Sequence, residues 1–145
     1  ATQSDAKKVG IKINLKNVDY NVLDGIGVRG EYDLLISNIL TEQAGDPEVF
    51  VNQYWKTNVD GSNPQNGSGY SNPEYDALSD QLASEFDPAK RRDIIIKMEK
   101  IVQDDAATLI FGYPQTNMVS NKSVQNANIY PCDYYWVTKD ITPAK

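Results

Sequence analysis

Two carboxylates, Glu42 and Asp46, lie four residues apart in a polar stretch that follows an apolar run. A carboxylate pair can perform acid–base work, and two such groups flanking a sugar bond are the usual equipment of glycoside hydrolases. Their position after an expected buried strand adds interest, because α/β proteins tend to place ligands in loops at strand ends. Only their closeness in sequence supports a catalytic pair.

Other catalytic equipment is missing. The chain has no histidine, and this removes the commonest general base, the usual partner of a serine or cysteine nucleophile, and the commonest metal ligand. Cys132 is the single cysteine, so it forms no intramolecular disulfide and reads best as a small buried apolar residue. Asp104 and Asp105 mark the end of a helix. The residue types therefore favour binding over catalysis, with no metal and no cofactor.

Two motifs resemble ligand-binding loops and fail on inspection. The loop from Asp60 resembles a calcium loop, but its sixth position is Gln65 where glycine is needed, and its twelfth is Ser71 where glutamate is needed. Residues 25–30 spell G-x-G-x-x-G. A dinucleotide-binding loop follows a strand and opens a helix, whereas this one precedes the expected strand at 32–36. Neither motif predicts a site.

Three helices are predicted by one device. Asp46, Asn72 and Asp87 can each cap a first helical turn, and each is followed by proline, which is favoured at the first helical position. Helical spacing of apolar residues then predicts one buried face on each of two consecutive helices. These faces hold Tyr75, Leu78, Leu82 and Phe86 after Asn72, and Ile94, Met98, Ile101 and Val102 after Asp87.

Strands are expected around these helices. Residues 9–16 alternate apolar and polar side chains, as in a strand with one wet face, and residues 32–36 form an apolar run typical of a strand covered on both faces. Further strands are expected at 109–113, near 118–119 and in the aromatic tail at 130–138, and a weakly helical link at 22–26. The predicted fold class is α/β, a mixed sheet flanked by helices.

The bulk properties are those of one soluble globular domain of 145 residues, with 40% hydrophobic and 23% charged residues. A net charge of −6 and the lack of a basic cluster argue against nucleic acid as a partner. No apolar run approaches the ~20 residues of a membrane helix, so no direct membrane insertion by this segment is expected. The N-terminus has no apolar stretch typical of a signal peptide.

Four stretches together carry a resemblance to a known family: residues 9–15, residues 30–34, Gly45-Asp46-Pro47 with Phe50, and Tyr70 through Phe111. In order and spacing they resemble the second lobe of the family 5 extracellular solute-binding proteins, the peptide, dipeptide and nickel receptors of ABC importers. The resemblance implies one lobe of a two-lobed, periplasmic-binding-protein-like type II fold. Residues 1–145 are then a single domain, part of the C-terminal lobe, and the first lobe is absent.

The resemblance also implies a mechanism. Solute is enclosed between two lobes that close about a hinge, and the closed form delivers it to the membrane permease subunits of an ABC importer. A separate ATPase supplies the energy, so no nucleotide is expected on this chain. The expected setting is extracytoplasmic in a bacterium, in the periplasm or as a cell-surface lipoprotein, and the expected state is a monomer. A peptide is the favoured solute.

The loop before Asp46 is where the chain departs from the family. In peptide-binding relatives this loop carries a tryptophan and an aspartate that pairs with the α-amino group of the ligand; the aligned positions here hold Leu40 and Gln43. Gln43 supplies no charge, so pairing with an ammonium falls to Glu42 or does not occur, and a sugar or other neutral solute becomes more plausible. The expected ligand-facing residues are Asn38, Thr41, Glu42 and Gln43.

Two other classes stay open. One is a small secreted enzyme that uses Glu42 with Asp46, for example on glycans. The other is a structural interaction domain that uses exposed aromatic residues. Under the family reading, Tyr134, Tyr135 and Trp136 pack near the hinge of the intact protein, or they are core aromatics of a terminal strand.

Overall fold

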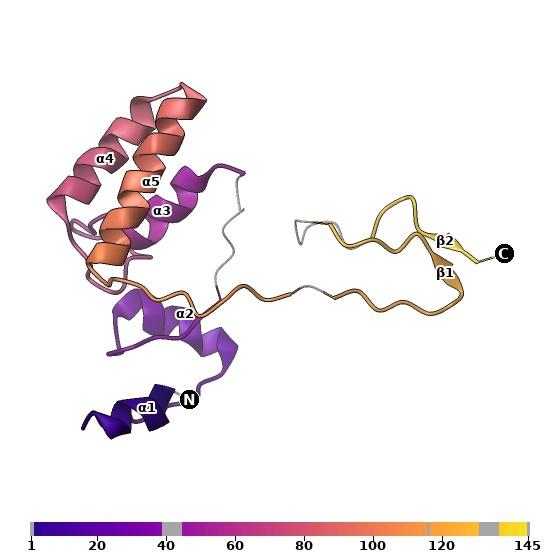
Figure 1. Ribbon diagram of the computed structural model, residues 1–145, viewed down its shortest axis with the longest axis horizontal. Helices are drawn as coiled ribbons and strands as arrows, with labels where there is room; N and C mark the ends of the chain where they lie inside the picture. The colour runs from indigo at the N-terminus through magenta and orange to yellow at the C-terminus, as the bar shows by residue number, and fades with distance from the viewer. Residues whose placement is uncertain (1, 39–44, 116, 131–136, 145) are drawn as a thin grey trace.

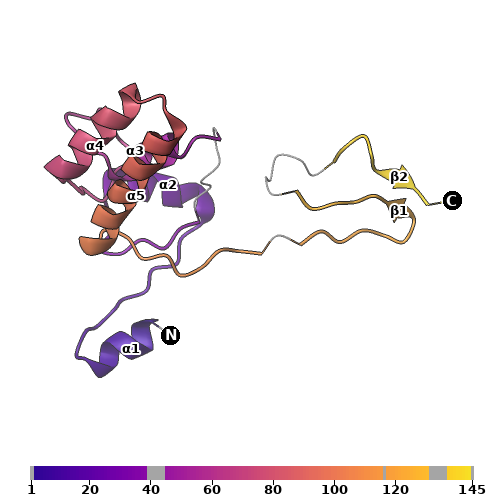
Figure 2. The same cartoon turned by 45° about the horizontal axis from the view of Figure 1, so that its top comes forward.

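The computed structural model describes residues 2–38, 45–115, 117–130 and 137–144. Five helices and two short strands lie in these ranges: α1 (Thr2–Lys8), α2 (Tyr20–Arg29), α3 (Pro47–Trp55), α4 (Pro73–Ser84), α5 (Pro88–Asp104), β1 (Val124–Gln125) and β2 (Thr142–Pro143). Helices α3, α4 and α5 pack on one another in one cluster (Figure 1), and β1 and β2 lie at the far end of the chain from it. The turned view shows α1 apart from the cluster (Figure 2). No helix within the described ranges has the length and apolar character needed to cross a membrane.

The three predicted caps are confirmed. The side chain of Asp46 accepts a hydrogen bond from the second amide of α3, Asn72 accepts two from the first turn of α4, and Asp87 accepts one from the first turn of α5. A proline occupies the first turn of each helix. The caps satisfy amides that a helix cannot satisfy internally, so these starts are fixed by local sequence.

The core lies between α3, α4 and α5. Its fully or nearly fully buried apolar side chains are Val51, Tyr75, Leu82, Ile94, Met98 and Val102. The predicted faces of α4 and α5 are confirmed at five of these positions, but Phe86 is 87% exposed. Helix α4 ends at Ser84 and the next residue is extended, so the helical spacing no longer applies when the chain reaches Phe86.

Two polar contacts tie α3 to α4 inside this apolar core. The buried Tyr75 hydroxyl donates to the Val51 carbonyl at 2.7 Å, and the Ser79 hydroxyl donates to the Asn52 side-chain oxygen at 2.8 Å. Within the described residues, every buried side-chain nitrogen or oxygen has a hydrogen-bond partner. The contacts therefore orient the two helices without leaving a buried polar group unsatisfied.

The long polar loop between α3 and α4 is held in place by its asparagines. The Asn63 side-chain amide donates to the carbonyls of Asn52 and Lys56 at 2.9 and 2.7 Å. The Asn66 amide, which is buried, donates to the carbonyls of Lys56 and Tyr70 at 2.9 and 2.8 Å. The asparagines thus replace the hydrogen bonds that a helix or sheet would give these carbonyls.

The G-x-G-x-x-G run belongs to the end of α2. Gly30 caps the helix in the left-handed conformation, at φ +64°. A Cβ at Gly67 would collide with the Gly27 carbonyl, and a Cβ at Gly30 would lie only 2.6 Å from the Gly67 carbonyl oxygen. These glycines let the backbone of α2 approach the backbone of the polar loop, which is a structural role.

The expected mixed sheet is wrong for the described residues. The sheet in these ranges is the antiparallel pair β1–β2, with Val124 opposite Pro143 and Gln125 opposite Thr142. Residues 9–16, 32–36, 109–113 and 118–119 form no strand; Leu34 is 76% exposed and Phe111 is 67% exposed. A strand needs a neighbouring strand for its backbone groups, and none of these segments has one among the residues that the structure describes.

Two other expectations have different outcomes. The weakly helical link at 22–26 is a full helix, α2, capped by Asp19, whose carboxylate accepts from the Asn21 amide at 2.9 Å. The tail prediction falls largely on residues 131–136, so Cys132 and the aromatic residues Tyr134, Tyr135 and Trp136 lie outside the described residues.

Candidate functional site

The four predicted ligand-facing residues precede α3 in the sequence. Asn38 is exposed in irregular chain that follows the 32–36 run. Thr41, Glu42 and Gln43 fall in residues 39–44, outside the described part of the chain. The described chain resumes at Gly45, which has a φ of +69° and leads directly into the Asp46 cap. The geometry described below is therefore that of Gly45 and Asp46, which follow the predicted contacts and lead into α3.

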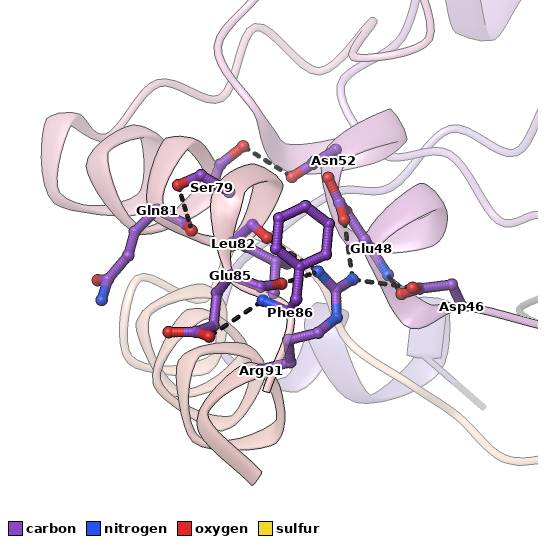
Figure 3. A network of polar contacts seen from close by, with 10 residues as sticks. Asp46, Glu48, Asn52, Ser79, Gln81, Leu82, Glu85, Phe86 and Arg91 are labelled. Atoms are coloured by element: carbon purple, nitrogen blue, oxygen red, sulfur yellow. Dashed lines mark hydrogen bonds and ion pairs between the residues drawn. The ribbon is translucent and has the colours of Figure 1, made fainter. Parts of the chain in front are cut away.

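Asp46 uses both of its carboxylate oxygens. One oxygen accepts from the Glu48 backbone amide at 2.9 Å and caps α3, and the other accepts from the Arg91 guanidinium at 2.8 Å (Figure 3). The hydrogen bond from the Glu48 backbone amide lowers the pKa of Asp46, and the Arg91 guanidinium lowers it further. Desolvation acts in the opposite direction. A lowered pKa suits a permanent anion and does not suit a proton donor at neutral pH.

Arg91 joins three structural elements. One terminal nitrogen donates to Asp46 and to Glu48 at the start of α3, at 2.8 and 2.9 Å. The other donates to the carbonyls of Leu82 and Glu85, both at 2.9 Å, at the end of α4 and in the corner that follows (Figure 3). The hydrogen bonds that Arg91 donates to Glu48 and, to a lesser extent, to Asp46 raise the pKa of Arg91, while desolvation opposes the rise. The loop end is therefore clamped to the α4–α5 corner.

An open hollow of about 470 Å³ lies beside this clamp. It is lined by the start of α3 with the two residues before it, and by α5, namely Gly45, Asp46, Pro47, Pro88, Arg91, Arg92, Ile95, Ile96 and Glu99. It faces solvent and is not an enclosed pocket, so it does not have the form of a small-molecule site that buries its ligand.

The other carboxylates considered from the sequence have structural partners. Asp105 accepts from the Tyr70 hydroxyl at 2.6 Å and from the Asn72 amide at 2.8 Å, which joins the end of α5 to the start of α4. Asp104 pairs with Lys100 on the surface at 2.9 Å. The prediction that Asp104 and Asp105 mark the end of a helix is confirmed, because α5 ends at Asp104 and Asp105 caps it. In the described ranges, no group of three or more His, Cys, Asp and Glu side chains is placed to hold a metal ion.

Arg91 is a structural residue that the sequence did not predict to pair with Glu48 and Asp46, the two acids 43 and 45 residues away. One signal was present: two acids, Asp46 and Glu48, stand at a helix start, and an arginine stands at another helix start of the same packed cluster. The buried Asn66 gave no signal beyond its place in a polar loop.

No family model matches the chain. The chain is similar to solute-binding proteins, and one of them is an ABC transporter substrate-binding protein of known structure. These similarities confirm the resemblance seen in the sequence. The chain is 32% identical over 126 residues to the probable D,D-dipeptide-binding periplasmic protein DdpA of Escherichia coli, a match that covers 86% of this chain and 24% of that protein. It is 30% identical over 135 residues to the nickel-binding protein NikA of Staphylococcus aureus, a match that covers 93% of this chain and 26% of that protein.

The solved structure is the ABC transporter substrate-binding protein CtaP of Listeria monocytogenes. It matches with a TM-score of 0.59 and 27% identity, over 72% of this chain and 20% of that one. The chain thus corresponds to a segment of an extracellular solute-binding protein and spans about a quarter of the length of the curated relatives. The fold agrees with part of a lobe of the type II binding-protein fold, present here as a helical cluster with a small sheet.

Proposed function

We propose that this chain is part of the C-terminal lobe of the solute-binding component of an ABC importer. The intact protein captures an extracytoplasmic solute between two lobes and delivers it to membrane permease subunits. The observation that carries the proposal is a match of 86% or more of the chain to two proteins named for dipeptide and nickel binding. The same match is the basis on which we propose an extracytoplasmic placement and a permease partner.

The solute class we propose is a peptide or a neutral solute of similar size. One relative is named for D,D-dipeptides and another for nickel, so the segment occurs in receptors for different solutes. Gln43, one of the predicted contacts, offers hydrogen bonds without charge. The proposed contacts are Asn38, Thr41, Glu42 and Gln43. The protein acts as a monomer, without a cofactor, and is anchored as a lipoprotein or free in the periplasm.

Catalysis by Glu42 with Asp46 has less support than binding. Both carboxylate oxygens of Asp46 are engaged by the α3 amide and by Arg91, and the pKa of Asp46 is lowered. A glycosidase needs one carboxyl group with a raised pKa to protonate the leaving group. We therefore propose that the chain is not an enzyme and that Asp46 holds the loop.

Isothermal titration calorimetry tests the proposal. The full-length protein that contains this chain and the 145-residue chain alone are titrated with dipeptides, tripeptides, oligosaccharides and nickel(II). We expect binding by the full-length protein and weak or no binding by the chain alone, since a ligand held between two lobes loses half of its enclosing surface. Tight binding by the chain alone contradicts the two-lobed mechanism. Turnover of a glycan that disappears in Glu42→Gln and Asp46→Asn favours the enzyme instead.

A further inference from the structure

We propose that Asn66 is a modification site: its side-chain amide is deamidated when the polar loop between α3 and α4 opens, and the carboxylate that forms prevents the loop from closing again. The reactive unit is Asn66-Gly67, the single Asn-Gly pair in the chain. The chemistry needs water and no solute, so it is independent of the proposed function.

Asparagine followed by glycine is prone to this reaction because glycine has no Cβ to shield its backbone nitrogen. The Gly67 nitrogen attacks Cγ of Asn66, the new N–Cγ bond forms, and the Cγ–Nδ2 bond breaks. Ammonia leaves with the proton of the Gly67 amide, and water then opens the succinimide to aspartate or isoaspartate. Asn63, which also holds the loop, precedes Pro64, whose nitrogen carries no hydrogen, so this step is not available there.

The native structure holds the leaving group. The Asn66 side chain is buried, and its Nδ2 donates to the carbonyls of Lys56 and Tyr70 at 2.9 and 2.8 Å. Its Oδ1 accepts from the Ser68 hydroxyl at 2.8 Å. Both amide hydrogens and the oxygen are therefore engaged, away from the water that must carry protons and hydrolyse the ring.

The native structure also holds the nucleophile. The Gly67 backbone packs against α2 so closely that a Cβ at Gly67 would collide with the Gly27 carbonyl. On its other side, the Gly67 carbonyl closely approaches Gly30. The Gly67 nitrogen therefore cannot move onto the side chain of Asn66 unless the loop separates from α2. Deamidation must wait for this local opening.

The product does not fit the position that the amide occupied. An ionised carboxylate only accepts hydrogen bonds, so at position 66 it would face the carbonyls of Lys56 and Tyr70 with repulsion in place of two hydrogen bonds. Burial of this unpaired charge costs further free energy. The effect extends to the end of α5 through Tyr70, whose hydroxyl donates to Asp105 at 2.6 Å. Deamidation should therefore release both the loop and this contact.

The first test measures reaction rates in the full-length protein that contains this chain. The protein is incubated at mildly alkaline pH in buffer and in denaturing urea, and peptide mapping by mass spectrometry gives the deamidated fraction at Asn66. Ser68→Ala removes the hydrogen bond to Oδ1. Ser123→Ala is its matched control, because the Ser123 hydroxyl donates to the side-chain oxygen of Asn121 at 3.1 Å in the other Asn-x-Ser motif.

We expect the wild-type protein to be deamidated at Asn66 at least about tenfold more slowly in buffer than in urea, because only the open fraction reacts. Ser68→Ala should raise the rate in buffer and leave the rate in urea unchanged, whereas Ser123→Ala should change neither. Equal wild-type rates in buffer and urea overturn the protection by the fold. Absence of deamidation at Asn66 in both conditions overturns the site itself.

The second test measures what the product does. Asn66→Asp reproduces the aspartate product, and Asn121→Asp is the matched control, because the Asn121 side-chain oxygen accepts from the Ser123 amide and hydroxyl, as a carboxylate can. Asn66→Asp should lower the urea midpoint and speed hydrogen exchange at 56–71, and Asn121→Asp should do neither. Equal midpoints and exchange in the two variants overturn the role of the product. If Asn66→Asp does not fold, hydrogen exchange of partly deamidated wild-type protein decides the same question.

Discussion

Removal of one buried hydroxyl, in Tyr75→Phe, tests how α3 and α4 are held together. The Tyr75 side chain is fully buried, and its hydroxyl donates to the Val51 carbonyl across the helix interface at 2.7 Å. Its ring meets the Tyr70 ring edge to face, with centroids 6.1 Å apart. Phenylalanine keeps the ring and its packing, so the variant removes the hydrogen bond alone. Burial raises the pKa of Tyr75, so the hydroxyl stays a donor at ordinary pH.

The magnitude follows from the acceptor. The Val51 carbonyl lies inside α3, whose own i→i−4 ladder offers it another partner. The loss is therefore that of a net hydrogen bond, about 1 kcal/mol, and not the larger penalty of an orphaned carbonyl. With ~2.1 cal/mol/K per residue over the whole chain, this corresponds to a fall in melting temperature of ~3 °C.

Urea unfolding followed by far-UV circular dichroism measures the loss in free energy of unfolding. Tyr113→Phe is the matched control, because that side chain is 85% exposed, and we expect a change within ~0.5 kcal/mol. Leu82→Ala sets the upper scale, since truncating a fully buried leucine costs ~2–5 kcal/mol. If Tyr75→Phe matches Tyr113→Phe, the hydroxyl does not tie the helices together; if it matches Leu82→Ala, the ring is displaced as well and the reasoning about a single bond is refuted.

Three further predictions follow from particular contacts. Gly67→Ala should lower the free energy of unfolding by ~1–3 kcal/mol because the new Cβ meets backbone that cannot yield, while Gly112→Ala, with open space around it, should not; equal urea curves contradict this. Asp46→Ala should lower the urea midpoint by more than Asp46→Asn, since asparagine still caps α3; the reverse order contradicts the capping role. Burial and the hydrogen bond to Asp105 raise the pKa of Tyr70 to about 12, so stability from its neutral form is complete below pH 10 and is lost as the pH rises through 12. Tyr70→Phe should reduce that alkaline slope; an unchanged slope means that other groups carry it.

The helices could be predicted because their signals are local. A capping side chain, the proline after it and the apolar spacing all lie within a few residues, and all three capped starts are confirmed. The same method failed at Phe86 because spacing continues past the point where a helix ends. Caps mark where a helix begins, whereas the end of α4 is set by the corner that Arg91 binds.

The strands and the clamp could not be predicted because they depend on distant partners. Residues 32–36 have a strand composition, yet a strand forms only where another strand is available to pair with it. Arg91 and Asp46 are 45 residues apart in sequence, and the residues around each of them do not indicate that the two side chains form an ion pair. Likewise, the contacts by which Asn63 and Asn66 fix the polar loop through backbone carbonyls have no signal in the local sequence.

The solute-binding hypothesis and the enzyme hypothesis make different demands on Asp46. A proton donor needs a carboxyl group with a raised pKa and an oxygen free to reach the substrate. A binding loop needs fixed ends, because a loop that must be ordered by its ligand spends part of the interaction free energy on that ordering. Asp46 has a lowered pKa, and its oxygens bind the α3 amide and Arg91. This arrangement suits a fixed anion and does not suit a proton donor, so Asp46 is better placed to hold the start of α3 than to protonate a leaving group.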